Sequence, residues 1–316
     1  LFAKTNSQIK TIHKHPIQVT EWSDAVKDDK RPQVLLLSGP TDNWNSDSAW
    51  FSRLAPKLTK NYRVVSIDRA GQLLATKDAP VGYAHFGDDL VKLLPKIRLN
   101  KPHIIAFASA NLALHQYFSH QDESKSVTVQ SITLIDPDVL TEFSIQRYSK
   151  DAKPFKDNLE QYLAYIGEGK YNQRAAQKNQ LERDHLKSLN TEDVETDWEY
   201  FERVLNKRLK LINLQNTFRE IAIYNDDLTK ASQTALPKDI PLLVIDTNFE
   251  QTYIDKEKDN NEKAGLVQWQ KDAAAYYKLL SKTANKGEYL YLATREHLLP
   301  FSNPDLLIEH LKTLTK

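Results

Sequence analysis

The sequence predicts an α/β protein with a mostly parallel sheet and helices on both of its faces. Short apolar runs, such as Val34–Leu37 and His103–Phe107, alternate with segments of helical period, such as Asp88–Ile97. Turn residues bound each run, which is typical of strands buried on both faces. Because neighbouring parallel strands need a crossover that is usually a helix, this alternation favours a parallel sheet.

The first two strands differ from the others because polar and apolar residues alternate in them. Ile9–Ile12 and Ile17–Trp22 flank a His-Lys-His-Pro turn, which predicts an antiparallel hairpin at the sheet edge. The later strands are apolar runs ended by turn residues, over residues 34–37, 62–67, 103–107, 131–135, 241–245 and 288–292. Apolar residues at helical spacing predict helices over residues 48–58, 88–97, 111–118, 265–281 and 304–314. Residues 251–263 are highly charged and are expected to be mobile.

A long polar segment interrupts this alternation. Residues 139–237 are highly charged and helical in period, and the clearest helices are expected at 158–166, 173–189 and 193–214. A structureless loop of that length is improbable, so we predict a helical cap inserted into a core of residues 1–138 and 238–316. The aromatic residues expected to line a pocket under the cap are Tyr162, Tyr165, Trp198 and Phe201.

The composition argues against several classes of protein. The 43 basic and 42 acidic side chains nearly cancel, so nucleic-acid binding is not expected. The chain has no cysteine, which excludes disulfides and thiolate chemistry. No apolar run approaches the roughly 20 residues that span a bilayer. Residues 1–4 are compatible with the tail of a signal segment cut near Ala3, which predicts a periplasmic or secreted protein, and otherwise a cytoplasmic one.

No metal or cofactor is expected from the sequence motifs. A phosphate-binding G-x-x-x-x-G-K-[ST] loop is absent from the chain. His13 and His15 share one face of a strand, but no third histidine or carboxylate lies near them in the sequence. We therefore interpret them as exposed turn residues rather than as metal ligands. Asp136 and Asp138 are interpreted as the end of a strand rather than as an acid–base pair.

Several short segments occur in an order that is typical of one superfamily. They are Leu35–Gly39, Trp50 with Leu54–Leu58, Arg63–Gly71, Lys101–Leu114, Ile135–Pro137, Pro241–Ile245, and His297–Pro300 with Pro304. On these segments the chain resembles the α/β-hydrolase superfamily, with a helical cap inserted after the sixth strand. The resemblance covers nearly all of the chain outside the cap, and it implies an eight-stranded sheet.

The resemblance implies a nucleophile on the sharp turn after the strand at 103–107. Family members carry small residues two before and two after this nucleophile, because the turn forces strand and helix together. For Ser109 these positions hold Phe107 and Asn111, a poor fit. Shifting the frame by one makes Ala106 and Ala110 the small flanks and puts Ala108 in the nucleophile position, which describes an inactive protein. The sequence contains no methionine at all. If a methionine were missing between Ser109 and Ala110, Ala110 would become the small residue two positions after Ser109, and the fit to the family would improve.

The same resemblance implies a general base and an acid. His297 follows the last strand and precedes Leu-Leu-Pro, as the superfamily's base does, and it would accept the Ser109 proton and return it to the leaving group. The acid is expected after the strand at 241–245, where Glu250 is the candidate and Asp246 and Asp255 are alternatives. The order Ser109, Glu250, His297 agrees with the order of the superfamily.

An oxyanion hole needs two backbone N–H groups directed at the developing negative charge. The first is expected from Ala110, the residue after Ser109. The second should come from the loop after the strand at 34–37, where Pro40 has no N–H and Thr41 could replace it.

Two functions are compatible with these residues. The first is metal-free hydrolysis of an ester, amide or similar acyl bond in a partly apolar small molecule, with Ser109 as nucleophile, His297 as base and Glu250 as its orienting acid. The second is a catalytically inactive protein of this fold that binds a small ligand or a protein partner. The geometry of the sharp turn after the strand at 103–107, called here the elbow, distinguishes the two functions, because the first requires the Ser109 hydroxyl to lie within hydrogen-bonding distance of His297.

Overall fold

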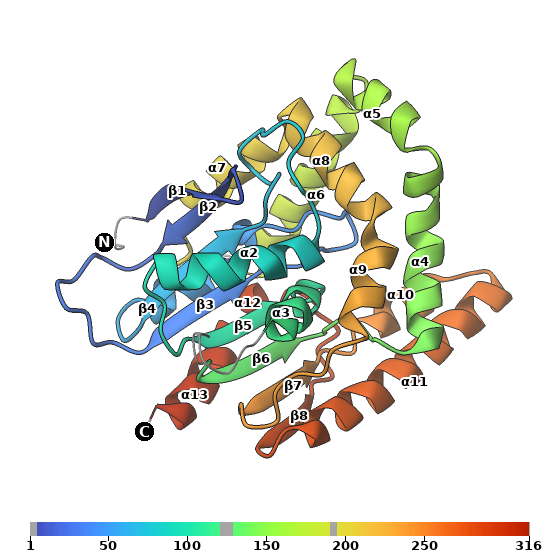
Figure 1. The fold of residues 1–316 in the computed structure, drawn as a ribbon. Helices are drawn as coiled ribbons and strands as arrows, with labels where there is room; N and C mark the ends of the chain where they lie inside the picture. Colours follow the sequence, from blue (N-terminus) through green and yellow to red (C-terminus); the bar gives the residue numbers. More distant parts are fainter. Residues whose placement is uncertain (1–4, 121–128, 190–194, 316) are drawn as a thin grey trace.

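The computed structural model describes residues 5–120, 129–189 and 195–315, so the predicted cleavage near Ala3 lies outside the described residues. Its centre is an eight-stranded sheet in the order β1-β2-β4-β3-β5-β6-β7-β8 (Figure 1). The strands are β1 (Asn6–Ile12), β2 (His15–Glu21), β3 (Gln33–Leu37), β4 (Arg63–Asp68), β5 (His103–Phe107), β6 (Ser131–Ile135), β7 (Leu242–Asp246) and β8 (Gly287–Tyr291). β1 and β2 form an antiparallel hairpin, β2 is antiparallel to β4, and the other neighbours are parallel. The predicted α/β class and the hairpin at the sheet edge are confirmed.

Helices cover both faces of the sheet, as predicted. One face packs against α2 (Tyr83–Lys96), α3 (Ala110–Ser119) and α11 (Asn260–Thr283). The other face packs against a 3₁₀ turn (Ser48–Phe51), α1 (Leu54–Leu58), α12 (Leu299–Ser302) and α13 (Pro304–Leu314). Successive side chains of a strand point to opposite faces, so Leu35 and Leu37 join the first core while Val34 and Leu36 join the second.

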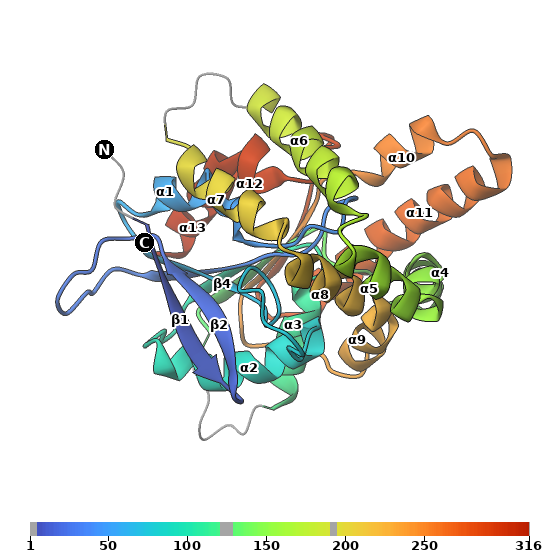
Figure 2. The same ribbon diagram turned by 90° about the horizontal axis from the view of Figure 1, so that it is seen from above.

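Further helices lie between β6 and β7. They are α4 (Glu142–Asp157), α5 (Leu159–Gly167), α6 (Asn172–Leu189), α7 (Trp198–Arg208), α8 (Leu211–Ala222) and α9 (Tyr224–Ala231), and Figures 1 and 2 show them at one end of the molecule. They fall within the range predicted for the cap, although the boundary between cap and core remains a prediction. The expected helix at 193–214 is divided between α7 and α8, and α4 and α9 were not expected. None of the described helices has the length and apolar character that crossing a membrane requires.

Three sequence-based expectations are wrong in detail. Most of residues 251–263 are helical, since α10 (Glu250–Lys256) and the start of α11 cover them and only residues 257–259 are irregular. The rings of Phe249, Tyr253 and Trp269 pack together and join α10 to α11. The expected helix at 48–58 is interrupted between Phe51 and Leu54. Helix α2 begins at Tyr83, five residues earlier than expected, because the carboxylate of Asp227 on α9 accepts hydrogen bonds from the N–H groups of Tyr83 and Ala84.

Candidate active site

The carboxyl ends of β3, β5, β6 and β7 open onto a cavity of about 710 Å³. Residues that follow these strands line its floor, among them Pro40, Ala108, Asp136 and Phe249. His297 enters from the loop that joins β8 to α12, and α4, α9 and α11 close the opposite side. Ligands of open α/β sheets bind at this edge of the strands, so the cavity is the candidate site.

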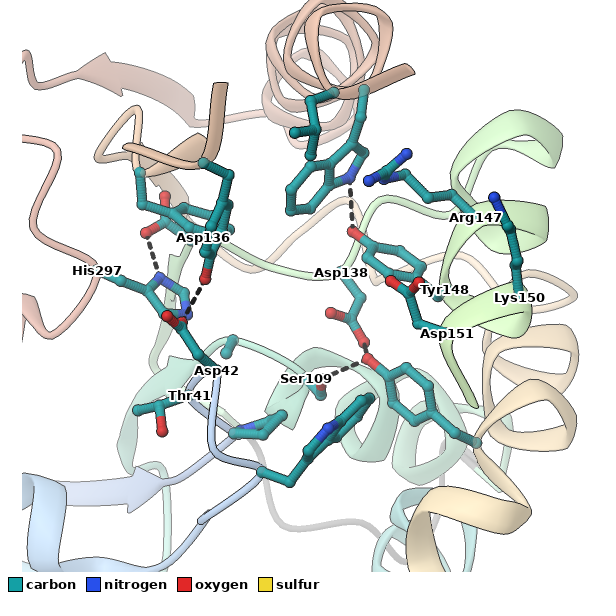
Figure 3. Close-up of a pocket in the computed structure, with 18 of the residues that line it drawn as sticks. Thr41, Asp42, Ser109, Asp136, Asp138, Arg147, Tyr148, Lys150, Asp151 and His297 are labelled. Carbon is teal, nitrogen blue, oxygen red and sulfur yellow. Dashed lines mark hydrogen bonds and ion pairs between the residues drawn. The ribbon is translucent and has the colours of Figure 1, made fainter. Parts of the chain in front are cut away.

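His297 and Asp136 form an ordered pair in this cavity. His297 Nδ1 lies 2.8 Å from Asp136 Oδ2 (Figure 3). The Asp136 carboxylate is buried and also accepts hydrogen bonds from the N–H and the hydroxyl of Thr247, at 2.8 and 2.5 Å. A carboxylate with these donors can only accept from His297, so the imidazole proton lies on Nδ1 and the Nε2 lone pair is free to act as a base.

Two aromatic rings hold the imidazole of His297 in place. Phe249 stacks on it with ring centroids 4.1 Å apart, and Phe107 lies against it at 4.6 Å. Phe107 therefore packs against His297, which explains why a bulky residue stands beside the turn. The ring of His297 can rotate little between these neighbours, as a positioned general base requires.

The turn between β5 and α3 places Ala108, not Ser109, at its apex. Ala108 has φ of +49°, whereas Ser109 has the helical φ of −63°. A positive φ is unusual for a residue other than glycine, and it marks the strained elbow position of this fold. Ala106 and Ala110 are then the small flanking residues, as the shifted frame described. The turn also lies against Gly39, where a Cβ would come within 2.4 Å of Phe107 O and Ser109 N.

Ser109 belongs to a second polar group in the cavity. Its hydroxyl lies 2.6 Å from the Tyr224 hydroxyl, which donates a short hydrogen bond to Asp138. Figure 3 shows Ser109 beside Asp138, while His297 and Asp136 lie on the opposite wall. Burial raises the pKa of Asp138 to about 6, partly offset by its hydrogen bonds with Tyr224 and Ser109. Asn111 fixes this group from below, because its side chain exchanges two 3.1 Å hydrogen bonds with the backbone of Asp138.

The carboxylate that pairs with His297 is Asp136, not the predicted Glu250. Glu250 begins α10 and is buried, and its Oε1 has no hydrogen-bond partner among the described residues. Burial and the nearby charge of Asp136 raise the pKa of Glu250 well above its usual value. Of the alternatives, Asp246 accepts a hydrogen bond from Tyr289 and Asp255 pairs with Arg295 at the surface.

The two backbone N–H groups predicted to form an oxyanion hole belong to Thr41 and Ala110. The N–H of Thr41 donates to the carbonyl of Asn45 at 3.2 Å, so a local turn already uses it. Ala110 is fully buried at the start of α3. With Ala108 at the apex, the residue after the elbow is Ser109, and its N–H is the equivalent of the donor predicted at Ala110.

The residues of the insertion that line the cavity come from α4 and α9. Arg147, Tyr148, Lys150, Asp151 and Pro154 of α4 and Tyr224 of α9 contribute. The four aromatic residues expected there pack elsewhere, since Tyr162 contacts Phe155 and Phe218, Trp198 and Phe201 pack on Phe301, and Tyr165 is half exposed. The cavity wall is therefore mixed, with aromatic rings and charged groups at its rim.

Comparisons with known proteins agree with this architecture. No family model matches the chain. An α/β hydrolase fold protein from Burkholderia ambifaria superposes with a TM-score of 0.57 at 14% identity, over 96% of each chain. The protein has the α/β-hydrolase fold. A putative epoxide hydrolase from Pseudomonas aeruginosa also superposes on the chain, with a TM-score of 0.63 at 14% identity. The superposition covers 98% of this chain and 94% of that one.

A local sequence match was found to a protein that is named as a hydrolase. The protein named "Putative carbamate hydrolase RutD" from Caulobacter vibrioides is 30% identical over 113 residues. The match covers 34% of this α/β-hydrolase-fold protein and 40% of the relative. The chain thus matches less than half the length of this relative.

Sequence reasoning interpreted Asp136 and Asp138 only as the end of a strand, whereas they contact His297 and Tyr224, and it did not single out Tyr148 or Tyr224. Asp136 could have been found, because β6 and β7 are parallel neighbours and an acid at the end of either strand can reach the same histidine. Tyr148 and Tyr224 carry no sequence signal, since only the packing of α4 and α9 over the sheet brings them to the cavity.

Proposed function

We propose that this protein hydrolyses a small acyl compound, such as an ester, amide or carbamate, with His297 as general base and Asp136 as the residue that orients it. The 2.8 Å hydrogen bond between His297 Nδ1 and the buried Asp136 carboxylate carries the proposal. It fixes the tautomer in which Nε2 can take a proton. The hydrolase-fold relatives support a hydrolytic reaction, and the name of the RutD protein suggests a carbamate among the substrates to test.

Water is the nucleophile that we propose. Ala108 at the elbow has no attacking atom, and the Ser109 hydroxyl is engaged with Tyr224. His297 Nε2 would take a proton from water as the oxygen attacks the acyl carbon. The tetrahedral intermediate would then lose the alcohol or amine, which regains the proton from His297. The products are a carboxylic or carbamic acid and the alcohol or amine.

Tyr148 and Tyr224 face this reaction from the other wall of the cavity. The Tyr148 hydroxyl accepts hydrogen bonds from the Val139 N–H at 3.1 Å and from the Trp269 indole at 3.3 Å. These bonds leave its own proton for a ligand oxygen. A carbonyl oxygen placed between Tyr148 and the Ser109 N–H would be polarised for attack.

The test compares variants on short p-nitrophenyl esters and a p-nitrophenyl carbamate. His297→Gln should lower kcat by about 10²- to 10⁴-fold, the usual contribution of a positioned base. His310→Gln, a substitution on α13 away from the cavity, is the matched control and should change kcat by less than about twofold. Wild-type hydrolysis that persists unchanged in His297→Gln would refute the proposal.

Ser109→Ala separates water attack from attack by the predicted Ser109 nucleophile. With water as the nucleophile, Ser109→Ala should keep most of the activity, and a fluorophosphonate probe should not label the wild type. If Ser109 attacks after leaving Tyr224, labelling would occur at Ser109 and Ser109→Ala would lose both labelling and turnover. This second outcome would restore the serine-hydrolase hypothesis.

The second candidate function is ligand binding without turnover. Ala108 at the apex of the elbow favours it, because the fold's usual covalent route is then absent. A folded wild type that turns over none of the esters or carbamates would support it if an ester analogue changes the intrinsic tryptophan fluorescence and this change is lost in Trp269→Phe.

A further inference from the structure

A cluster of histidines lies where the sheet-edge hairpin meets α2. His13 and His15 flank the β1–β2 turn, and His85 and Asp89 lie one helical turn apart near the start of α2. Figure 2 shows the tip of the hairpin beside this helix. The four residues, called here the histidine cluster, do not line the candidate active site. The sequence-based interpretation of His13 and His15 as exposed turn residues is wrong for His15, which is buried at the start of β2. It also did not foresee that α2 supplies a third histidine and a carboxylate.

Asp89 is the centre of the histidine cluster. Its side chain is fully buried, and each of its oxygens faces imidazole nitrogens. His13 Nδ1 lies 2.7 Å and His85 Nε2 3.6 Å from Oδ1, while His15 Nε2 lies 3.2 Å from Oδ2. Ligand atoms of His13, His85 and Asp89 all lie within 4.8 Å of one another. The imidazole rings are close as well, with centroids of His15 and His85 5.3 Å apart.

His15 has the orientation of a metal-binding histidine. Its Nδ1 lies 3.1 Å from the carbonyl oxygen of His13, and this ring nitrogen must be the donor. In the neutral ring, Nε2 then carries a lone pair that points toward the Asp89 carboxylate. A lone pair that faces a carboxylate oxygen at 3.2 Å is repelled by it, and either a proton on Nε2 or a metal ion beside the two atoms removes this repulsion. Histidine ligands of metal ions commonly have their second nitrogen fixed by a carbonyl in this way.

His85 supplies an independent observation. Its Nε2 is buried and has no hydrogen-bond partner among the described residues, and the nearest carboxylate oxygen, at 3.6 Å, is beyond hydrogen-bonding distance. A buried ring nitrogen without a partner costs about 1–3 kcal/mol, which a ligand bound to it would recover. The open position of His85 Nε2 is directed at Asp89.

We propose that the histidine cluster is a structural site for a divalent transition metal of the zinc class, with His13, His85 and Asp89 as the ligands that the structure already brings together. Two ligands of a tetrahedral zinc ion lie about 3.3 Å apart, since each metal–ligand bond is about 2.0–2.1 Å long. The distances of 2.7 and 3.6 Å from Asp89 Oδ1 to His13 Nδ1 and His85 Nε2 bracket this separation. His13 is exposed on the turn, and it moves outward from its 2.7 Å hydrogen bond to complete the set.

The metal would link the β1–β2 hairpin to α2 and so stabilise the edge of the sheet. β1 is the edge strand of the sheet, and its hairpin reaches α2 through the cluster. His15, whose Nε2 lies 3.2 Å from the other oxygen of Asp89, would become the fourth ligand as the site closes on the metal, and four protein ligands are typical of structural zinc sites. This role does not depend on the hydrolytic function proposed above.

The experiment measures metal bound to tag-free protein. After incubation with zinc chloride and dialysis, we expect about one zinc per chain by elemental analysis, and a rise of several degrees in Tm. Asp89→Asn and His85→Gln should each weaken zinc binding by more than about 100-fold, because even residues behind the ligands change metal affinity 10- to 100-fold. Co²⁺ in place of zinc should give the visible absorption of a tetrahedral site in the wild type and lose it in both variants.

His120→Gln is the matched control. His120 is an exposed histidine that pairs with Asp88, the neighbour of Asp89 on the same helix. It should bind zinc as the wild type does. If Asp89→Asn fails to fold, His85→Gln and His13→Gln decide, since both residues are partly exposed. A wild type that retains no zinc, or variants that bind it as tightly as His120→Gln does, would overturn the proposal.

Discussion

Asp136→Asn is the most informative substitution in the candidate active site, because it keeps the shape of the side chain and removes its charge. The carboxylate accepts from both Thr247 groups and from His297 Nδ1. An amide that keeps its oxygen in the Oδ1 position, where the Thr247 N–H donates, must place its NH₂ group in the Oδ2 position. The NH₂ group then faces His297 Nδ1 and the Thr247 hydroxyl, which can turn to accept from it. Nδ1 then becomes an acceptor, the imidazole proton moves to Nε2, and the base is lost.

The expected loss follows from that change of tautomer. The corresponding Asp→Asn change in Ser-His-Asp enzymes lowers kcat about 10⁴-fold, and we expect a loss of about 10³- to 10⁴-fold here. This equals about 4 to 5 kcal/mol of transition-state stabilisation. Thr247→Val, which removes one hydroxyl but keeps the Asp136–His297 pair, should cost less than about tenfold.

Two measurements test this prediction. Turnover of p-nitrophenyl esters gives the change in kcat, and ¹⁵N chemical shifts of His297 report which ring nitrogen carries the proton. The shifts should show the proton on Nδ1 in the wild type and on Nε2 in Asp136→Asn. A folded Asp136→Asn protein with the wild-type tautomer, or with kcat within about threefold of wild type, would refute the reasoning.

Three further substitutions test the elbow, a buried ion pair and a helix cap. Ala108→Ser puts a hydroxyl on the residue at the apex of the turn, whose backbone already has the φ of +49°. A fluorophosphonate probe should therefore label this variant and not the wild type. Equal labelling of both proteins would contradict the assignment of the apex to residue 108. Arg69→Met leaves the buried Glu220 carboxylate without its 2.6 Å partner and should lower the free energy of unfolding in urea by about 3–5 kcal/mol, whereas a loss below about 1 kcal/mol would show that water reaches Glu220. Burial raises the pKa of Asp227 to about 7, against about 3.9 in an unfolded chain. The folded protein therefore binds the Asp227 proton more tightly than the unfolded chain does. The free energy of unfolding should then fall as the pH rises from about 4 to about 7. Urea titrations of Asp227→Asn across this range should give a shallower slope, and an unchanged slope would assign the pH dependence to other groups.

The position of His297 was predictable from the sequence, and the identity of the carboxylate that pairs with it was not. His297 follows the last strand at a spacing that the superfamily shares, and the chain leads it directly into the cavity. The acid was expected after β7 at Glu250, but Asp136 after β6 makes the hydrogen bond. Both strands end at the same edge, so sequence spacing alone does not distinguish them. The donors of Thr247 on the neighbouring strand end decide which carboxylate is held toward the histidine.

The elbow could be narrowed to two residues from the sequence. The small residues Ala106 and Ala110 favoured Ala108 at the apex, whereas the superfamily's serine favoured Ser109. The backbone places its positive φ at Ala108, and the Ser109 side chain finds Tyr224 of α9. A contact between residues 115 positions apart in the chain leaves no local pattern.

The sequence by itself determined the α/β class, the edge hairpin, most of the strands and the arrival of His297 near the turn after β5. These features depend on local patterns, since apolar runs, helical spacing and turn residues act over a few residues. Tertiary structure alone decided that Asp136 pairs with His297, that Tyr148 and Tyr224 wall the cavity, and that His85 and Asp89 join the two hairpin histidines. Each of these groups joins residues from separate strands and helices, and only the packing of those elements fixes the distances on which their chemistry depends.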